Sequence, residues 1–63
     1  MIKQFSRVRL VDGAEGDVMD VYTDPEGYDI DISDPAPGVP LPKNWIRLVT
    51  PDQIEEVLRE PKD

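Results

Sequence analysis

Apolar and acidic positions alternate in the middle of this chain, most regularly from Tyr28 to Ile32. A period of two places successive side chains on opposite faces of an extended backbone. The three apolar residues of this run therefore share one face, and Asp29 and Asp31 share the other. The pattern predicts a β-strand with one buried and one solvated face.

The preceding segment, Asp17 to Thr23, predicts a second strand with a flaw in its alternation. Val18 and Val21 cannot face the same side of a regular strand, and a bulge near Met19-Asp20 resolves the conflict. Asp24-Pro25-Glu26-Gly27 has the residues of a type I turn, with Asp first, Pro second and Gly fourth. Residues 16–33 are thus predicted to form a bulged hairpin.

Both flanks of the hairpin also carry strand patterns. Phe5 to Val11 alternates Arg7 and Arg9 with apolar residues, which predicts a first strand with one wet face. Two glycines in residues 12–16 then indicate a loop with positive-φ positions. After the hairpin, Lys43 to Val49 predicts a further strand.

Residues 34–42 contain four prolines, which cannot donate to a ladder, so we expect a stiff extended connection there. Residues 51–60 carry the start signals of a helix. Thr50 is placed as N-cap, Pro51 as the first helical residue and Gln53 as the partner in a capping box. We therefore predict a short C-terminal helix.

The run Val8-Arg9-Leu10-Val11-Asp12-Gly13-x-x-Gly16-x-Val18-x-x-Val21, followed by Tyr28-x-Ile30-x-Ile32, resembles a pattern of small bacterial SH3-like barrels. It is most similar to short bacterial proteins of unknown function with that fold. KOW-type barrels of ribosomal and transcription proteins are similar, as are barrel subunits of photosynthetic and ferredoxin-linked complexes. The resemblance covers roughly Arg7 to Ile32, with a looser echo in Trp45 to Val49. Together with the predicted elements it indicates a single all-β domain over residues 1–63, a small SH3-like barrel of four to five short strands with the C-terminal helix. It implies no function, because the matching residues are core and turn positions.

The charge distribution indicates which class of macromolecule the chain would bind. The chain has 63 residues and a formal net charge of −7, with no basic residue between Arg9 and Lys43. A strongly acidic chain repels nucleic-acid phosphates, which Lys and Arg must neutralise, so the charge argues against nucleic acid and for a basic protein partner. No signal-peptide or membrane-spanning run is present, so we expect a cytoplasmic bacterial protein with no membrane partner.

Catalytic and metal chemistry find little support. Without His or Cys there is no conventional nucleophile and base pair, so we predict no catalytic residues, no cofactor and no enzyme activity. The run from Asp29 to Asp34 imitates the start of an EF-hand loop. It has Asp34 where the loop needs Gly and Pro40 where it needs Glu. Strand alternation explains the spacing, and no metal site is predicted.

Candidate contact residues remain on the hairpin and after the proline-rich connection. The outward acids of the hairpin are either a solvated face or a docking surface for a basic partner. An exposed Trp or Tyr is the commonest kind of interface anchor, although burial in the core explains these residues as well. The candidates are Trp45, Tyr22, Tyr28, Asp20, Asp29 and Asp31.

We therefore expect a non-catalytic acidic protein-interaction module. It would act as an inhibitor, an antitoxin or immunity-type protein, or an accessory subunit. The alternative is an RNA- or ribosome-associated KOW-like barrel that binds through Arg7, Arg9, Lys43 and Arg47. Self-association is left open, as is the Pro37-Gly38-Val39-Pro40 motif, which either stiffens its loop or is an SH3 ligand.

Overall fold

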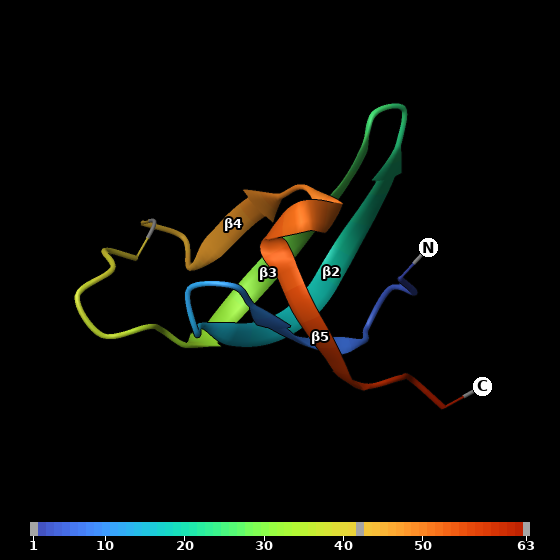
Figure 1. The fold of residues 1–63 in the computed structure, drawn as a ribbon. Coiled ribbons are helices and arrows are strands. Elements are labelled where there is room, and N and C mark those ends of the chain that lie inside the picture. The colour runs from blue at the N-terminus through green and yellow to red at the C-terminus, as the bar shows by residue number, and fades with distance from the viewer. Residues whose placement is uncertain (1, 42, 63) are drawn as a thin grey trace.

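A computed structural model describes residues 2–41 and 43–62 of the chain. It contains a five-stranded antiparallel sheet in the order β4-β3-β2-β1-β5, so the chain is all-β (Figure 1). Within the described residues, no pairing joins β4 to β5, and the sheet is not closed. The strands are β1 (Arg7–Leu10), β2 (Glu15–Thr23), β3 (Glu26–Asp34), β4 (Ile46–Val49) and β5 (Ile54–Arg59).

The β2–β3 hairpin is the longest unit of the sheet, and its tip extends beyond the other strands (Figure 1). The predicted bulge is confirmed. Val18 pairs with Ile30 and Asp20 with Asp29, which leaves Met19 without a partner across the ladder. The extra residue puts the side chains of Val18 and Val21 on one face, as the sequence requires.

The turn of this hairpin differs from the predicted one. Thr23 already pairs with Glu26, so Asp24 and Pro25 alone form the connection, joined by a cis peptide bond. Gly27 is therefore a strand residue rather than the last residue of the turn.

The core lies on the inner face of the curved sheet. Inward positions of β1, β2 and β3 alternate with outward ones, as the period-two patterns predict. Every inward residue of the predicted strand 28–32 is buried, which confirms that prediction. The buried apolar residues are Val8, Leu10, Ala14, Val18, Tyr28, Ile30, Ile32, Ala36 and Val49.

Gly16 lets β2 and β3 approach closely. A Cβ atom at this position would lie 2.2 Å from the carbonyl oxygen of Asp31, so no larger residue fits without a backbone shift. Gly13, by contrast, has a φ of 98° in the β1–β2 turn, which is the positive-φ role expected for that loop.

The proline-rich connection contains no strand in its described part after Asp34, the last residue of β3, and it projects from the sheet (Figure 1). It is tied to the fold by Ala36, which is buried, and by Val39 and Leu41, which pack against the core. Pro42, one of its four prolines, lies outside the described residues.

The prediction of a C-terminal helix is wrong. Its start signals produce only a single 3₁₀ turn, η1 (Pro51–Gln53), in which the Thr50 amide donates to Oε1 of Gln53 at 3.0 Å. The chain then extends as β5 and pairs with β1, with Ile54 opposite Leu10. An isolated helix of this length is marginal in water. Pairing with β1 satisfies the open edge of that strand and packs Ile54 against the core.

Candidate functional site

The outward acids of the hairpin form two directly opposed pairs. In the ladder between β2 and β3, Asp20 lies opposite Asp29 and Asp17 lies opposite Asp31. Asp20 and Asp31 are exposed, while Asp29 is half-buried. The structure thus brings three of the predicted contact residues, Asp20, Asp29 and Asp31, together on one outer face.

Arginines neutralise the half of this face that borders β1. A guanidinium nitrogen of Arg7 lies 2.9 Å from a carboxylate oxygen of Asp34 and another lies 3.5 Å from Asp17. The same side chain donates to the Ser33 hydroxyl at 2.7 Å. Arg9 contacts Glu56 at 3.0 Å in the same manner. The acids of β2 nearest β1 are therefore matched by positive charge.

Asp29 and Asp31 of β3, and Asp20 of β2 opposite Asp29, have no such partners. Among the described residues, no Lys or Arg nitrogen lies within 4.0 Å of the carboxylates of Asp20, Asp29 or Asp31. Opposed like charges on neighbouring strands are destabilising. A cationic group from another molecule would find these carboxylates free of internal ion pairs. We call these three residues the acidic row.

Tyr22 contacts the acidic row at the end nearest the hairpin turn. Its side chain is 47% exposed, and its hydroxyl donates to Oδ2 of Asp29 at 2.7 Å. This hydrogen bond to a carboxylate raises the pKa of the Tyr22 phenol, because it stabilises the protonated form. The bond orients Asp29 without neutralising it.

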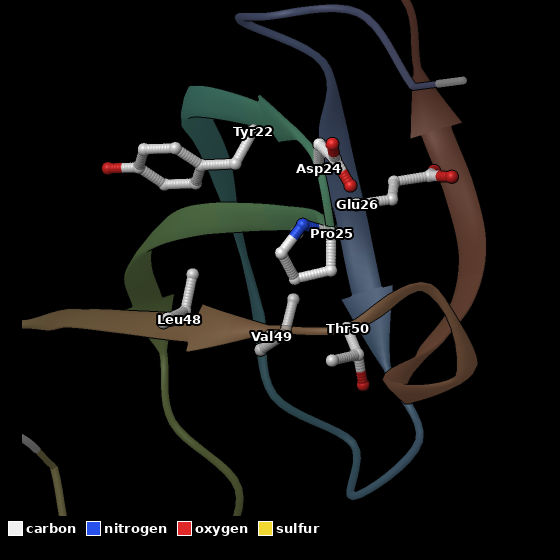
Figure 2. A pocket seen from close by; sticks show the side chains of 8 residues that line it. Tyr22, Asp24, Pro25, Glu26, Leu48, Val49 and Thr50 are labelled. Atoms are coloured by element: carbon white, nitrogen blue, oxygen red, sulfur yellow. The ribbon is translucent and has the colours of Figure 1, made fainter.

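A groove opens between Tyr22 and Leu48 because the residue between them is Gly27. Gly27 pairs with Tyr22 across the hairpin, and a Cβ atom built on it would approach Leu48 Cδ1 to 3.6 Å. Without that side chain, a shallow cavity of about 330 Å³ remains on the outer face. Figure 2 shows Tyr22, Pro25, Leu48 and Val49 around it, all presenting apolar atoms.

Two acidic residues also line this groove. Asp24 and Glu26 line it beside Pro25, and Thr50 closes the side toward η1 (Figure 2). The Glu26 carboxylate accepts from the hydroxyl of the buried Tyr28, so Asp24 supplies the acidic group at this end of the groove. An apolar side chain beside a positive charge suits this combination. We call the cavity the Gly27 groove.

Trp45 is exposed, as a contact residue must be. Its side chain is 51% exposed and its backbone has a φ of 64°, immediately before β4 begins. Its carbonyl accepts a hydrogen bond from the Ile32 amide at 2.8 Å, which fixes the residue at the end of the β3–β4 ladder.

Tyr28 does not belong to this surface. It is fully buried, and its hydroxyl accepts from the Ile2 amide at 3.2 Å and donates to the Glu26 carboxylate. Burial raises the pKa of its phenol, and the Glu26 bond acts in the same direction. The strand period that made Tyr28 a core candidate describes it correctly, and its assignment as a contact residue does not hold.

The basic residues considered for nucleic acid do not form one patch. Arg47 pairs with Ile30, which faces the core, and its guanidinium contacts Asp12 at 2.8 Å. Arg7 and Arg9 lie on the outer face and are engaged by carboxylates. Lys43 is exposed, in the segment before Trp45.

Ile46 and Leu48 are 37% and 65% exposed and were not among the contact residues predicted from the sequence. The signal was present, because residues 46 and 48 share one side of a strand and Arg47 and Val49 the other. Which side faces water was not decided by that pattern. The pairing of β4 with β3, Leu48 opposite Asp29 and Ile46 opposite Asp31, places both beside the acidic row.

Comparisons of the chain with protein-family models, with curated proteins and with solved structures find no match. Within residues 2–41 and 43–62, no cluster of three or more Asp, Glu, His or Cys side chains has the arrangement of a metal site. The same part of the chain contains no helix that is long and apolar enough to cross a membrane.

Proposed function

We propose that this chain is a non-catalytic protein-interaction module that docks on a basic protein partner through the outer face of β2, β3 and β4. One observation carries the proposal: Arg7 and Arg9 of β1 form ion pairs with the acids within their reach, among them Asp17, Asp34 and Glu56. The acidic row has no such ion pair among the described residues. The exposed apolar side chains of Ile46 and Leu48 adjoin that row.

The acidic row and the exposed apolar residues would affect different steps of binding. Unpaired carboxylates attract a basic partner over long range and raise the association rate. Apolar anchors slow dissociation, because fully burying a side chain such as Leu or Phe contributes about 1.5–3 kcal/mol. The Gly27 groove is the place for one such anchor from the partner, and Trp45 and Leu48 supply anchors from this chain.

We further propose that the sheet is an SH3-like barrel and that the chain acts in the bacterial cytoplasm. An antiparallel order in which β1 lies between β2 and β5, with a 3₁₀ turn before the last strand, supports a small SH3-like barrel that is open between β4 and β5. An acidic module of this kind suits an inhibitor, an antitoxin or immunity-type protein, or an accessory subunit in the bacterial cytoplasm.

The test uses a variant in which the acidic row is neutralised, Asp20→Asn, Asp29→Asn and Asp31→Asn. A control variant carries the same change of charge elsewhere, at Asp52, Glu55 and Glu60, which lie in or near η1 and β5. Tagged chains are used to capture proteins from extracts of the native cell, with quantitative mass spectrometry. We expect a captured protein with a basic surface that the wild type and the control retain and the acidic-row variant loses.

Unfolding would not explain such a loss, because removing opposed like charges stabilises the hairpin. Equal capture by all three chains would contradict the proposal. Retention on a nucleic-acid column at physiological salt, lost on Arg7→Glu, would favour the RNA-associated alternative instead.

A further inference from the structure

β4 is an edge strand of the sheet. Half of its backbone N–H and C=O groups point away from β3, its neighbour in the sheet. The Trp45 carbonyl accepts from the Ile32 amide, which fixes the phase of the antiparallel ladder. Backbone groups of successive residues alternate in direction, so those of Arg47 and Val49 point to β3. Those of Ile46 and Leu48 point to the open edge.

Both ends of this open edge are already capped. The Ile46 amide donates to Oδ1 of Asn44 at 3.1 Å, and the Thr50 amide donates to Oε1 of Gln53 at 3.0 Å. Between these caps, the Leu48 amide and the carbonyls of Ile46 and Leu48 have no partner among the described residues. A short, bounded row of backbone groups is therefore available for pairing.

The side chains on this edge do not protect it. Proteins usually blunt an exposed edge with Lys, Pro or a bulge. The outward side chains of β4 are instead Ile46 and Leu48, and Leu48 is 65% exposed. A strand added here would cover both of them.

We propose, resting on the function proposed above, that β4 accepts an extended segment of the partner as an added strand. The segment would alternate Lys or Arg with apolar residues. Its outward side chains would run over Ile46 and Leu48, with their charged ends toward Asp29 and Asp31. Its inward side chains would lie beside the inward row of β4, which ends at the buried Val49.

A second copy of this chain is the other candidate for the edge, and charge disfavours it. Each chain carries a net charge of −7, and pairing β4 with β4 would bring two acidic rows toward each other. Like-charge juxtaposition at an interface is unfavourable. The charge of the face thus selects a basic segment over self-association.

The first experiment titrates the full chain with a synthetic peptide of alternating lysine and valine. Two control peptides carry the same residues in separate blocks, or glutamate in place of lysine. Two-dimensional NMR follows the Leu48 amide and its hydrogen exchange. We expect the alternating peptide to bind at least about tenfold more tightly than either control and to protect that amide from exchange. Equal binding of the block peptide would overturn strand addition.

The second experiment blocks the edge without altering any side chain. N-methylation of Leu48 in the chemically synthesised chain removes the outward amide proton and leaves the ladder with β3 in place. We expect peptide binding to fall by about tenfold or more. Unchanged binding by a folded N-methylated chain contradicts the proposal. If the methylated chain does not fold, cross-strand contacts between the peptide and Leu48 in the unmodified chain decide the question.

These outcomes separate the two proposals. Partner capture that depends on the acidic row, with the Leu48 amide unprotected, leaves the docking function standing and removes strand addition. Peptide binding and Leu48 protection that persist in the acidic-row variant contradict charge selection of the segment. Self-association of the unmodified chain through β4 would replace the basic segment by a second copy.

Discussion

Asp20 lies directly opposite Asp29 in the ladder between β2 and β3, and no basic side chain of the described residues neutralises either carboxylate. The Tyr22 hydroxyl donates a hydrogen bond to Asp29 at 2.7 Å but carries no positive charge. The hairpin at the centre of the sheet therefore carries an opposed like-charge pair that lowers its stability. Docking of a cationic group would remove this repulsion.

Neutralising one member of that pair should stabilise the protein. We expect Asp20→Asn to raise the free energy of unfolding by about 0.2–1 kcal/mol, because opposed like charges on neighbouring strands repel. Urea unfolding at low salt measures the change, and high salt should reduce it by screening. Asp17→Asn is the matched control: Asp17 also opposes an acid but lies 3.5 Å from Arg7, so no gain is expected. A loss of stability on Asp20→Asn would contradict the prediction.

Asp12 should contribute to acid unfolding. Its pKa is lowered first by the hydrogen bond from the Ala14 amide and then by Arg47. A lowered pKa in the folded state gives stability above the unfolded value of about 3.9, lost as pH falls through the folded pKa. We expect Asp12→Asn to cost about 0.5–1 kcal/mol at neutral pH and to lose less stability on acidification.

Chemical denaturation at several pH values between neutrality and the acid range would show this as converging curves for the wild type and Asp12→Asn. Arg47→Gln should reproduce part of the effect, because it removes the charge that contacts Asp12. Parallel curves for wild type and Asp12→Asn would mean that Asp12 has the same pKa in the folded and unfolded chain.

Tyr28 should make the protein sensitive to alkali. Burial is the main cause that raises the pKa of its phenol, followed by the Glu26 bond. A raised pKa gives stability that is complete below the unfolded value of about 10 and is lost as pH rises through the folded pKa. We expect Tyr28→Phe to flatten the loss of stability above about pH 10. Ultraviolet absorbance of phenolate, compared with Tyr22→Phe, separates the two tyrosines.

The C-terminal segment should respond to substitution as a strand. Glu56 is exposed and pairs with Arg9, so Glu56→Thr and Glu56→Ala both lose the same ion pair. Strands favour Thr over Ala, and helices favour Ala over Thr by a few tenths of a kcal/mol. We expect the Thr variant to be the more stable in thermal unfolding. The opposite order would indicate the helix that the sequence signals.

Two glycines of the hairpin should differ sharply in their tolerance of a methyl group. A Cβ at Gly16 would lie 2.2 Å from the Asp31 carbonyl oxygen, whereas the nearest atom at Gly27 is 3.4 Å away. We expect Gly16→Ala to cost about 1–3 kcal/mol or more through overpacking, and Gly27→Ala to cost little. Equilibrium unfolding compares them. Gly27→Ala also partly fills the Gly27 groove, so it should weaken partner binding while the fold persists.

Local patterns predicted the hairpin well. The conflict between Val18 and Val21 located the bulge, because a period of two leaves no other way to place both on the core face. The prediction of a C-terminal helix was wrong because the outcome depended on a distant strand rather than on local residues. Thr50 and Gln53 do form a capping box, and one 3₁₀ turn follows Thr50. These residues carry no information about the edge of β1, with which the following residues pair.

The candidate contact surface was only partly predictable. Asp20, Asp29 and Asp31 were correctly placed on an outer face by alternation, but alternation does not tell which acids an arginine neutralises. Tyr28 has the residue type of an interface anchor and is instead a core residue. Leu48 has the residue type of the core and is among the most exposed apolar side chains.

The sequence by itself determined the strands of the hairpin, the bulge and the face on which each hairpin side chain lies. These properties depend on contacts between neighbours along the chain and on the two-residue period. Only the tertiary structure decided that β5 pairs with β1, that β4 ends the sheet, and that Arg7 neutralises one half of the acidic face. Those properties depend on pairings between segments far apart in the chain, which no local pattern encodes.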